Sequence, residues 1–182
     1  MPKRSAIRCD CGRTVLELDG QPIVTVECHC DSCRQAALRL ESLADAPKLA
    51  EANGGTRAVL YRKDRIDCVS GAETLAEHRL DPASKTRRVV ATCCNSAMFL
   101  DFTPGHWLTL YARRWQERDR PPLDMRVMVA DRPAELAPLP ADVPNLPGHS
   151  FPFMLRLIRA WVGMGFRRPK LDWVRGTIDE KA

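Results

Sequence analysis

The sequence predicts a small, mostly β domain built around bound metal, followed by a proline-rich arm and a C-terminal helix. Three observations predict this arrangement. Seven of the eight cysteines fall into three tight clusters, short β-branched runs alternate with turn residues along most of the chain, and apolar residues recur at helical spacing near its end. At 182 residues, the chain has the length of one domain with an appendage.

The β-rich part of the sequence is predicted to begin with a hairpin. Residues 13–18 and 22–28 are short and β-branched, and Asp19-Gly20 lies between them as a turn. A helix is expected over 34–52, which is rich in Ala, Leu and Glu. The remaining strands are predicted at 56–62, 65–69, 87–92, 97–102, 107–111 and 123–129.

The last third of the sequence changes character. Five prolines between Pro133 and Gly148 predict an extended arm. Beyond the arm, apolar residues repeat at helical spacing, which predicts a helix that packs on the body or on a partner; they are Phe153, Met154, Leu157, Ile158, Trp161 and Val162. We therefore expect a metal-binding domain over 1–132, a proline-rich arm over 133–150 and a basic helical extension over 151–182.

Positive charge is concentrated in this extension. The whole chain has a formal net charge of +5, and residues 151–182 hold seven Lys/Arg against three Asp/Glu. A basic tail can meet nucleic acid, an anionic membrane or an acidic small molecule, or it can be a solvated surface. The solvated surface is favoured over nucleic-acid or membrane contact as the commoner explanation. Few aromatic residues stand within the basic run, which weakens the case for stacking on nucleic-acid bases.

The cysteine spacing favours metal binding over disulfides. The first residues include no apolar run of the kind found in a signal peptide, and no segment has the composition of a transmembrane span. C-x-C and C-x-x-C spacings in a chain without a leader are typical of thiolate metal ligands in a reducing compartment. The sequence therefore predicts a cytoplasmic protein that binds zinc, the metal favoured by soft thiolates.

Two zinc sites are expected from the three clusters. Cys9, Cys11 and Cys93 could close a structural site, to which Cys94 could contribute only if the chain turns after Cys93, because adjacent side chains of a straight strand face opposite ways. Otherwise a water would complete this site. The central cluster, Cys28, Cys30 and Cys33, offers three thiolates from one turn and leaves the fourth position open.

Three thiolates with an open position are typical of a catalytic zinc, so Cys28, Cys30 and Cys33 are the candidate catalytic residues. His29 lies between two of these ligands and is expected to point away from their metal. Cys68 stands alone in a strand-like run and is interpreted as an inert buried thiol.

The three cysteine motifs also carry a family resemblance, over roughly residues 5–130. They are Cys9-Asp10-Cys11-Gly12, Cys28-His29-Cys30-Asp31-Ser32-Cys33-Arg34 and Cys93-Cys94-Asn95-Ser96. Their order resembles the glutathione-dependent formaldehyde-activating enzyme and centromere protein V family. The resemblance implies a β-tent fold of packed antiparallel sheets, a structural zinc, a second zinc at the central trio, and condensation of glutathione with formaldehyde, a reaction classed as carbon–sulfur lyase.

This chain departs from the family pattern in two places, as a divergent branch would. The late motif of the family is C-x-x-C-G, whereas Ser96 and Ala97 occupy its last two positions here. The segment Gln35-Ala36-Ala37-Leu38 replaces a Gly and aromatic residues that help to shape the glutathione pocket of the named enzyme. The chain therefore keeps the zinc frame of the family and changes its glutathione pocket.

These observations favour a zinc-dependent, carbon–sulfur lyase-like protein that acts on a glutathione-type adduct of a small aldehyde. Arg34 is the first candidate to bind an anionic thiol substrate, with Arg57 and Arg62 behind it; the alternative is that Arg34 pairs with a surface acid. A rival function from another class is a non-catalytic zinc module that binds a partner through its basic tail. The sequence leaves open whether the protein is an enzyme.

Overall fold

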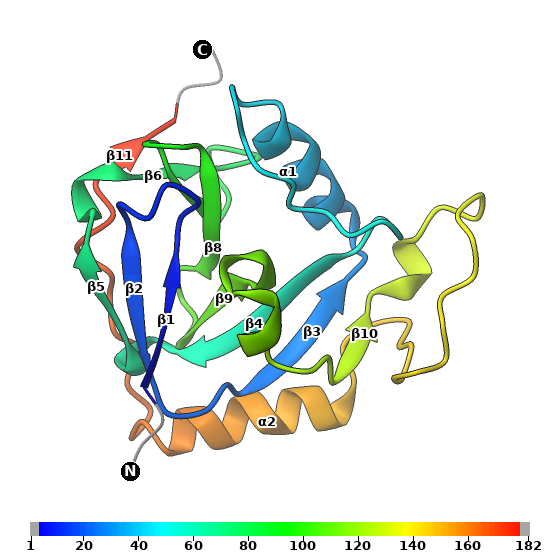
Figure 1. Ribbon diagram of the computed structural model, residues 1–182. Helices are drawn as coiled ribbons and strands as arrows, with labels where there is room; N and C mark the ends of the chain where they lie inside the picture. The colour runs from blue at the N-terminus through cyan, green and yellow to red at the C-terminus, as the bar shows by residue number, and fades with distance from the viewer. Residues whose placement is uncertain (1–3, 179–182) are drawn as a thin grey trace.

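Strands dominate the structure and form two packed sheets, as predicted. A computed structural model describes residues 4–178 (Figure 1). The larger sheet has the order β10-β3-β4-β9-β8-β7-β6-β11, and its pairs are antiparallel except at the two ends, β10 with β3 and β11 with β6. Its strands are β3 (Val24–Cys28), β4 (Thr56–Arg62), β6 (Leu75–His78), β7 (Thr86–Ala91), β8 (Ser96–Phe102), β9 (Trp107–Tyr111), β10 (Met125–Val127) and β11 (Gly176–Thr177).

The smaller sheet covers one face of the larger one. It is antiparallel and has the order β1-β2-β5, formed by β1 (Arg4–Arg8), β2 (Val15–Asp19) and β5 (Ile66–Ser70). The main hydrophobic core lies between the two sheets, where Ile7, Leu16 and Leu18 of the small sheet join the buried side chains of Phe99 and Leu110. Period-two alternation along β2 explains this packing, because every second side chain faces the core.

Within residues 4–178, two α-helices accompany the sheets, and both lie where the sequence predicts a helix. The first, α1 (Asp31–Glu41), begins within the central cysteine cluster and is shorter than the predicted 34–52, since it ends at Glu41, before Pro47. The second, α2 (Phe151–Val162), is capped by Ser150, whose side chain accepts a hydrogen bond from the N–H of Phe153. No helix in residues 4–178 is long and apolar enough to cross a membrane.

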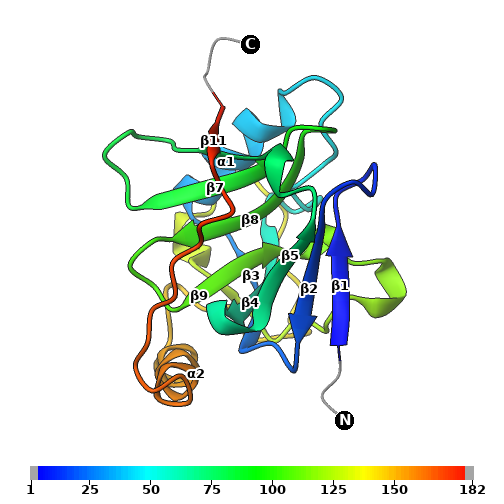
Figure 2. The ribbon, with the colours of Figure 1, turned by 90° about the vertical axis from the view of Figure 1, so that its left-hand side faces the viewer.

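The C-terminal segment returns along the domain. After α2 the chain runs up one side of the large sheet and ends as β11, beside β6 (Figure 2). On the way, Trp173 packs edge-on against Phe99, with ring centroids 5.5 Å apart. The proline-rich segment also contacts the body, because the N–H of Arg126 donates to the carbonyl of Pro144 at 2.8 Å. The division of the chain at 132 and 150 stays a prediction.

The predicted hairpin of 13–18 with 22–28 is wrong. The first of these runs, β2, pairs with β1 and β5 in the small sheet, whereas the second, β3, pairs with β4 and β10 in the large sheet. Gly20 (φ 80°) turns the chain out of the small sheet, and the N–H of Ile23 already donates to Leu60 of the large one. The strand Arg4–Arg8, which the sequence analysis missed, takes the place of the expected partner.

A buried ion pair holds the turn after β4 to β8. Lys63 Nζ lies 2.8 Å from Asp101 Oδ1, and both side chains are almost completely buried. Arg87 Nε also donates to this carboxylate at 2.9 Å. Removing one partner of a buried pair leaves an uncompensated charge away from water, which costs far more than loss of an exposed pair.

We expect Lys63→Ala to lower the free energy of unfolding by about 3–5 kcal/mol. The matched control is Lys48→Ala, because Lys48 is 81% exposed and its pair with Glu41 is worth less than about 1 kcal/mol. Chemical denaturation of both variants measures the difference. Equal destabilisation by the two substitutions would contradict a structural role for the buried pair.

Candidate metal centres

The first and third cysteine clusters come together in the structure. The sulfur atoms of Cys9, Cys11, Cys93 and Cys94 all lie within 4.8 Å of one another. The sulfurs of Cys11 and Cys93 are 3.4 Å apart, and those of Cys93 and Cys94 are 4.0 Å apart. Four thiolates around a tetrahedral zinc, each about 2.3 Å from the metal, would lie about 3.8 Å apart. The spacing of this group therefore fits a zinc ion.

Two tight turns present these four thiols. Cys9 and Cys11 lie in the turn between β1 and β2, where Gly12 (φ 79°) adopts the left-handed conformation and its N–H donates to the Cys9 carbonyl. Cys93 and Cys94 lie in the turn between β7 and β8, which Asn95 completes with a φ of 48°. The chain therefore turns after Cys93, which is the condition for both adjacent cysteines to face one metal.

Ser96, which stands where the family pattern has cysteine, borders this group. Its hydroxyl lies 3.1 Å from the sulfur of Cys94 and accepts a hydrogen bond from the N–H of Asp10. Burial raises the pKa of the Cys94 thiol, but hydrogen bonds from Ser96 and Cys11 outweigh it and lower that pKa to about 6. Cys94 thus supplies the fourth sulfur, and Ser96 supports it.

The central cluster forms a second group. Cys28 ends β3, Cys30 caps the N-terminus of α1, and Cys33 lies in the first turn of that helix. Their three sulfurs lie within 4.8 Å of one another, and no further His, Cys, Asp or Glu of residues 4–178 joins them. The capping position explains this convergence, because the Cys30 sulfur accepts the backbone N–H of Cys33 at 3.4 Å.

The surroundings of the trio favour a thiolate at Cys30. Hydrogen bonds from the thiols of Cys28 and Cys33 lower the pKa of Cys30 to about 2, and the positive charge of Arg88 acts in the same direction. The hydrogen bond to Cys30 conversely raises the pKa of Cys28 to about 11. Arg88 is almost fully buried on β7, and its guanidinium donates to the Ser32 hydroxyl at 2.6 Å. Arg88 thus places a buried positive charge next to the turn that carries Cys30 and Cys33.

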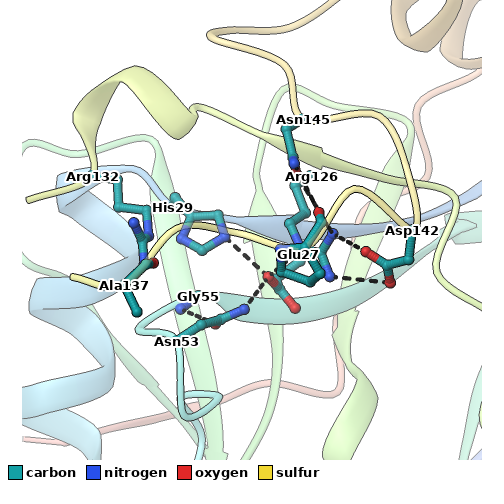
Figure 3. Close-up of polar contacts among 10 residues, drawn as sticks. Glu27, His29, Asn53, Gly55, Arg126, Arg132, Ala137, Asp142 and Asn145 are labelled. Atoms are coloured by element: carbon teal, nitrogen blue, oxygen red, sulfur yellow. Dashed lines mark hydrogen bonds and ion pairs between the residues drawn. The ribbon is translucent and has the colours of Figure 1, made fainter. Parts of the chain in front are cut away.

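His29 points away from the trio, as predicted. Its Nε2 donates to Glu27 Oε1 at 3.0 Å, and its backbone N–H donates to the carbonyl of Val127 on β10. The same carboxylate oxygen accepts hydrogen bonds from Asn53 at 2.8 Å and from Arg126 Nε at 3.0 Å (Figure 3). These contacts lower the pKa of Glu27 although burial alone raises it. A buried carboxylate therefore holds the backbone on which Cys28 and Cys30 stand.

The network continues into the proline-rich segment. Arg126 Nη1 donates to Asp142 Oδ1 at 2.7 Å and to the carbonyl of Pro140 at 3.2 Å (Figure 3). Asn145 lies beside the same guanidinium, and the backbones of Arg126 and Asn145 form an isolated parallel β-bridge. Through Arg126, the segment after β10 is connected to the turn that carries the central cysteines.

The arginines proposed to bind substrate are all engaged. Arg34 pairs with Asp31 and donates to the carbonyl of Asp131, so the surface-acid pairing is present in the structure. Arg57 donates to the carbonyl of Pro121 at 2.8 Å, and Arg62 binds Asp64 through two hydrogen bonds. Cys68 is half-buried against the core and apart from both thiol groups, and burial raises its pKa.

Sequence reasoning missed the charged residues that support the trio, Glu27, Arg88 and Arg126. Each interrupts an apolar strand: Glu27 follows Val-Thr-Val, Arg88 precedes Val-Val-Ala, and Arg126 separates Met125 from Val127. A charge inside an apolar strand indicates a buried partner, because an unpaired charge is too costly there. That signal was available, but the identity of the partners was not.

Comparison with known proteins identifies the family. The profile described as glutathione-dependent formaldehyde-activating enzyme (GFA) matches residues 4–111, from β1 to the end of β9. The chain belongs to the GFA family. Membership implies glutathione-dependent activation of formaldehyde and agrees with zinc-binding cysteine groups. Both thiol groups lie within the matched residues, whereas Arg126, the proline-rich segment and α2 lie beyond them.

Other comparisons add little to the GFA assignment. No curated protein matches the sequence. A solved structure of a Rhodobacter sphaeroides protein aligns with 65% of this chain and 97% of its own length, with 15% sequence identity and a TM-score of 0.46.

Gly55 packs against the network that supports the trio, and it provides a test of how tightly that network is built. A Cβ atom at this position would lie 2.7 Å from Glu27 Cγ and 2.8 Å from His29 Cε1, both of which belong to buried side chains. We expect Gly55→Ala to lower the free energy of unfolding by about 1–3 kcal/mol through overpacking. Thermal or chemical denaturation measures this change in the free energy of unfolding.

Gly148→Ala is the matched control, because a Cβ at Gly148 meets no atom within 4 Å. Its free energy of unfolding should stay within about 0.5 kcal/mol of the wild-type value. If Gly55→Ala were as well tolerated as this control, the close packing around Glu27 and His29 would be refuted.

Proposed function

We propose that the protein binds two zinc ions, a structural one at Cys9, Cys11, Cys93 and Cys94 and a reactive one at Cys28, Cys30 and Cys33. The fold would then be the β-tent of the GFA family, and the reduced thiols would suit a cytoplasmic protein. In support, all eight cysteines are free thiols, and seven of them form the two groups. Thiolates are the ligands that favour zinc over magnesium or calcium.

The function we propose is that of a carbon–sulfur lyase-like enzyme which acts on a glutathione-type adduct of a small aldehyde. The observation that carries this proposal is the difference between the two thiol groups. The first has four sulfurs, typical of a closed structural site, whereas the second has three and, among residues 4–178, no further protein ligand. Zinc bound at the trio would supply a Lewis acid with an open position at which a thiol loses its proton.

The reaction needs few groups from the protein. A thiol sulfur adds to the carbonyl carbon of the aldehyde, a C–S bond forms, and the carbonyl oxygen takes up a proton; the lyase direction reverses these steps. No oxidant or other reactant is required. The chain's contribution is to hold the trio in one orientation through Glu27, His29 and the cap of α1, and to offset the charge of the thiolates with buried Arg88.

Arg34 is the proposed contact for an anionic group of the thiol substrate. Arg34 directly follows Cys33 in the sequence, and its side chain is partly exposed. Binding of a carboxylate there would compete with the Asp31 carboxylate. Arg34→Met should therefore raise the KM for the thiol and leave metal content unchanged, which steady-state kinetics and elemental analysis would measure. Loss of metal in this variant would instead assign Arg34 to the support of the site.

Metal content tests the two sites separately. We expect about two zinc ions per chain by elemental analysis and native mass spectrometry, and about one in either Cys11→Ser or Cys30→Ser. Loss of a structural zinc removes folding free energy, so Cys11→Ser should also unfold at lower temperature than Cys30→Ser. Cys68→Ser is the matched control and should keep both ions. Wild-type protein with intact thiols and no zinc would refute both sites.

Activity tests the trio directly. Nuclear magnetic resonance can follow the condensation of glutathione with formaldehyde, which wild-type protein should accelerate over the spontaneous reaction. Folded Cys30→Ser should lose at least about ten-fold of this acceleration, whereas Cys68→Ser should retain it. A zinc-loaded wild-type protein that neither binds thiols nor accelerates the reaction would favour the rival function, a non-catalytic zinc module that binds a partner through its tail.

A further inference from the structure

The helix α2 lies at the outer margin of the molecule. Its inner side packs on the large sheet, where Phe153 and Leu157 are buried with side chains of β3, β4 and β10. His106 fixes it further, because Nε2 lies 2.9 Å from the Leu157 carbonyl. Figure 1 shows α2 along the lower edge of the domain, and Figure 2 shows it end-on at a corner, with the body on one side only. A flat surface can therefore approach its outer side.

This outer side is apolar. Of the eight large apolar side chains that are exposed in residues 4–178, five belong to α2 and the turn after it: Phe151 (78%), Met154 (44%), Ile158 (49%), Val162 (53%) and Phe166 (61%). The first four follow helical spacing and form one stripe, opposite Phe153 and Leu157. A contiguous exposed stripe of this kind marks a contact surface, because burying it is favourable.

The segment that carries the stripe is basic. From Phe151 to Leu171 the sequence contains no Asp or Glu and five basic residues, Arg156, Arg159, Arg167, Arg168 and Lys170. Arg156 pairs with Asp124 at 3.1 Å, and Arg168 lies over the ring of Trp161. Arg159 lies beside the stripe on α2, and Arg167, Arg168 and Lys170 follow the end of this helix. The surface therefore offers an apolar strip bordered by cations.

We propose that this face of α2 docks on an anionic lipid bilayer. The apolar stripe would enter the boundary between headgroups and acyl chains, and the arginines and Lys170 would meet lipid phosphates. Charge decides against a second copy of the chain as the occupant, because two such faces would bring their basic residues together. The surface lies outside the residues of the GFA match, so this inference is independent of the proposed thiol chemistry.

Vesicle flotation tests the proposal with the full-length protein. Wild-type protein should bind phosphatidylcholine vesicles that contain phosphatidylglycerol at least about ten-fold more tightly than vesicles of phosphatidylcholine alone, and high salt should weaken the binding. The double variant Phe151→Ser/Ile158→Ser should weaken binding at least about ten-fold. Each of Arg159→Gln and Arg168→Gln should weaken it roughly five-fold, on anionic vesicles only.

Two control variants make comparable substitutions away from α2. Val69→Ser removes an apolar side chain that is 51% exposed on β5, and Arg118→Gln removes a guanidinium on a side chain that is 82% exposed. Both should bind vesicles like the wild type. None of the variants touches the cysteine groups, and thermal denaturation of each variant serves as a check of folding.

Three outcomes would overturn the proposal. Absence of binding to anionic vesicles would do so directly, and equal binding to neutral vesicles would remove the role of the basic residues. A concentration-dependent dimer in sedimentation that Phe151→Ser/Ile158→Ser abolishes, without vesicle binding, would make this face an interface between copies.

Discussion

The four-thiol group is the constraint on which the arrangement of the two sheets depends. Cys9 and Cys93 are 84 positions apart in the sequence, yet their sulfurs are 3.7 Å apart. They stand in turns of different sheets, so a metal shared by these turns would fix the small sheet over the large one and close the core between them. Hydrophobic burial favours any compact packing of the sheets, whereas metal ligation requires a single one.

The central trio depends on the body in a different way. Its ligands follow one another closely in the sequence, so local geometry alone brings them together. The rest of the domain supports these ligands through Glu27, Arg88 and Arg126, which are charged, buried and hydrogen-bonded. Such groups are costly unless every partner is in place, and for that reason they define one arrangement of the ligand turn. The site is thus rigid where a thiol substrate would have to be oriented.

The residues beyond the GFA match connect these features to the outside of the molecule. Arg126 and Asp142 tie the proline-rich segment to the support of the trio, and α2 with the returning C-terminal segment covers the large sheet. One side of α2 therefore completes the core while the other remains apolar and exposed. If that face docks on lipid and the trio has the proposed activity, the thiol chemistry would take place on a membrane-bound protein.

The sequence specifies the features that depend on near neighbours in the chain. It predicted both helices, the bounds of β4 and the grouping of the cysteines, because caps, alternation and tight turns act over a few residues. Only the fold settles which strands pair with β2, that the chain turns at Asn95 so that Cys94 joins the four-thiol group, and which side chains contact Glu27 and Arg88. It also decided which apolar residues of α2 are buried. Phe153 and Ile158 are both apolar residues of the predicted helix. Only the position of the large sheet makes Phe153 the covered side chain and Ile158 the exposed one.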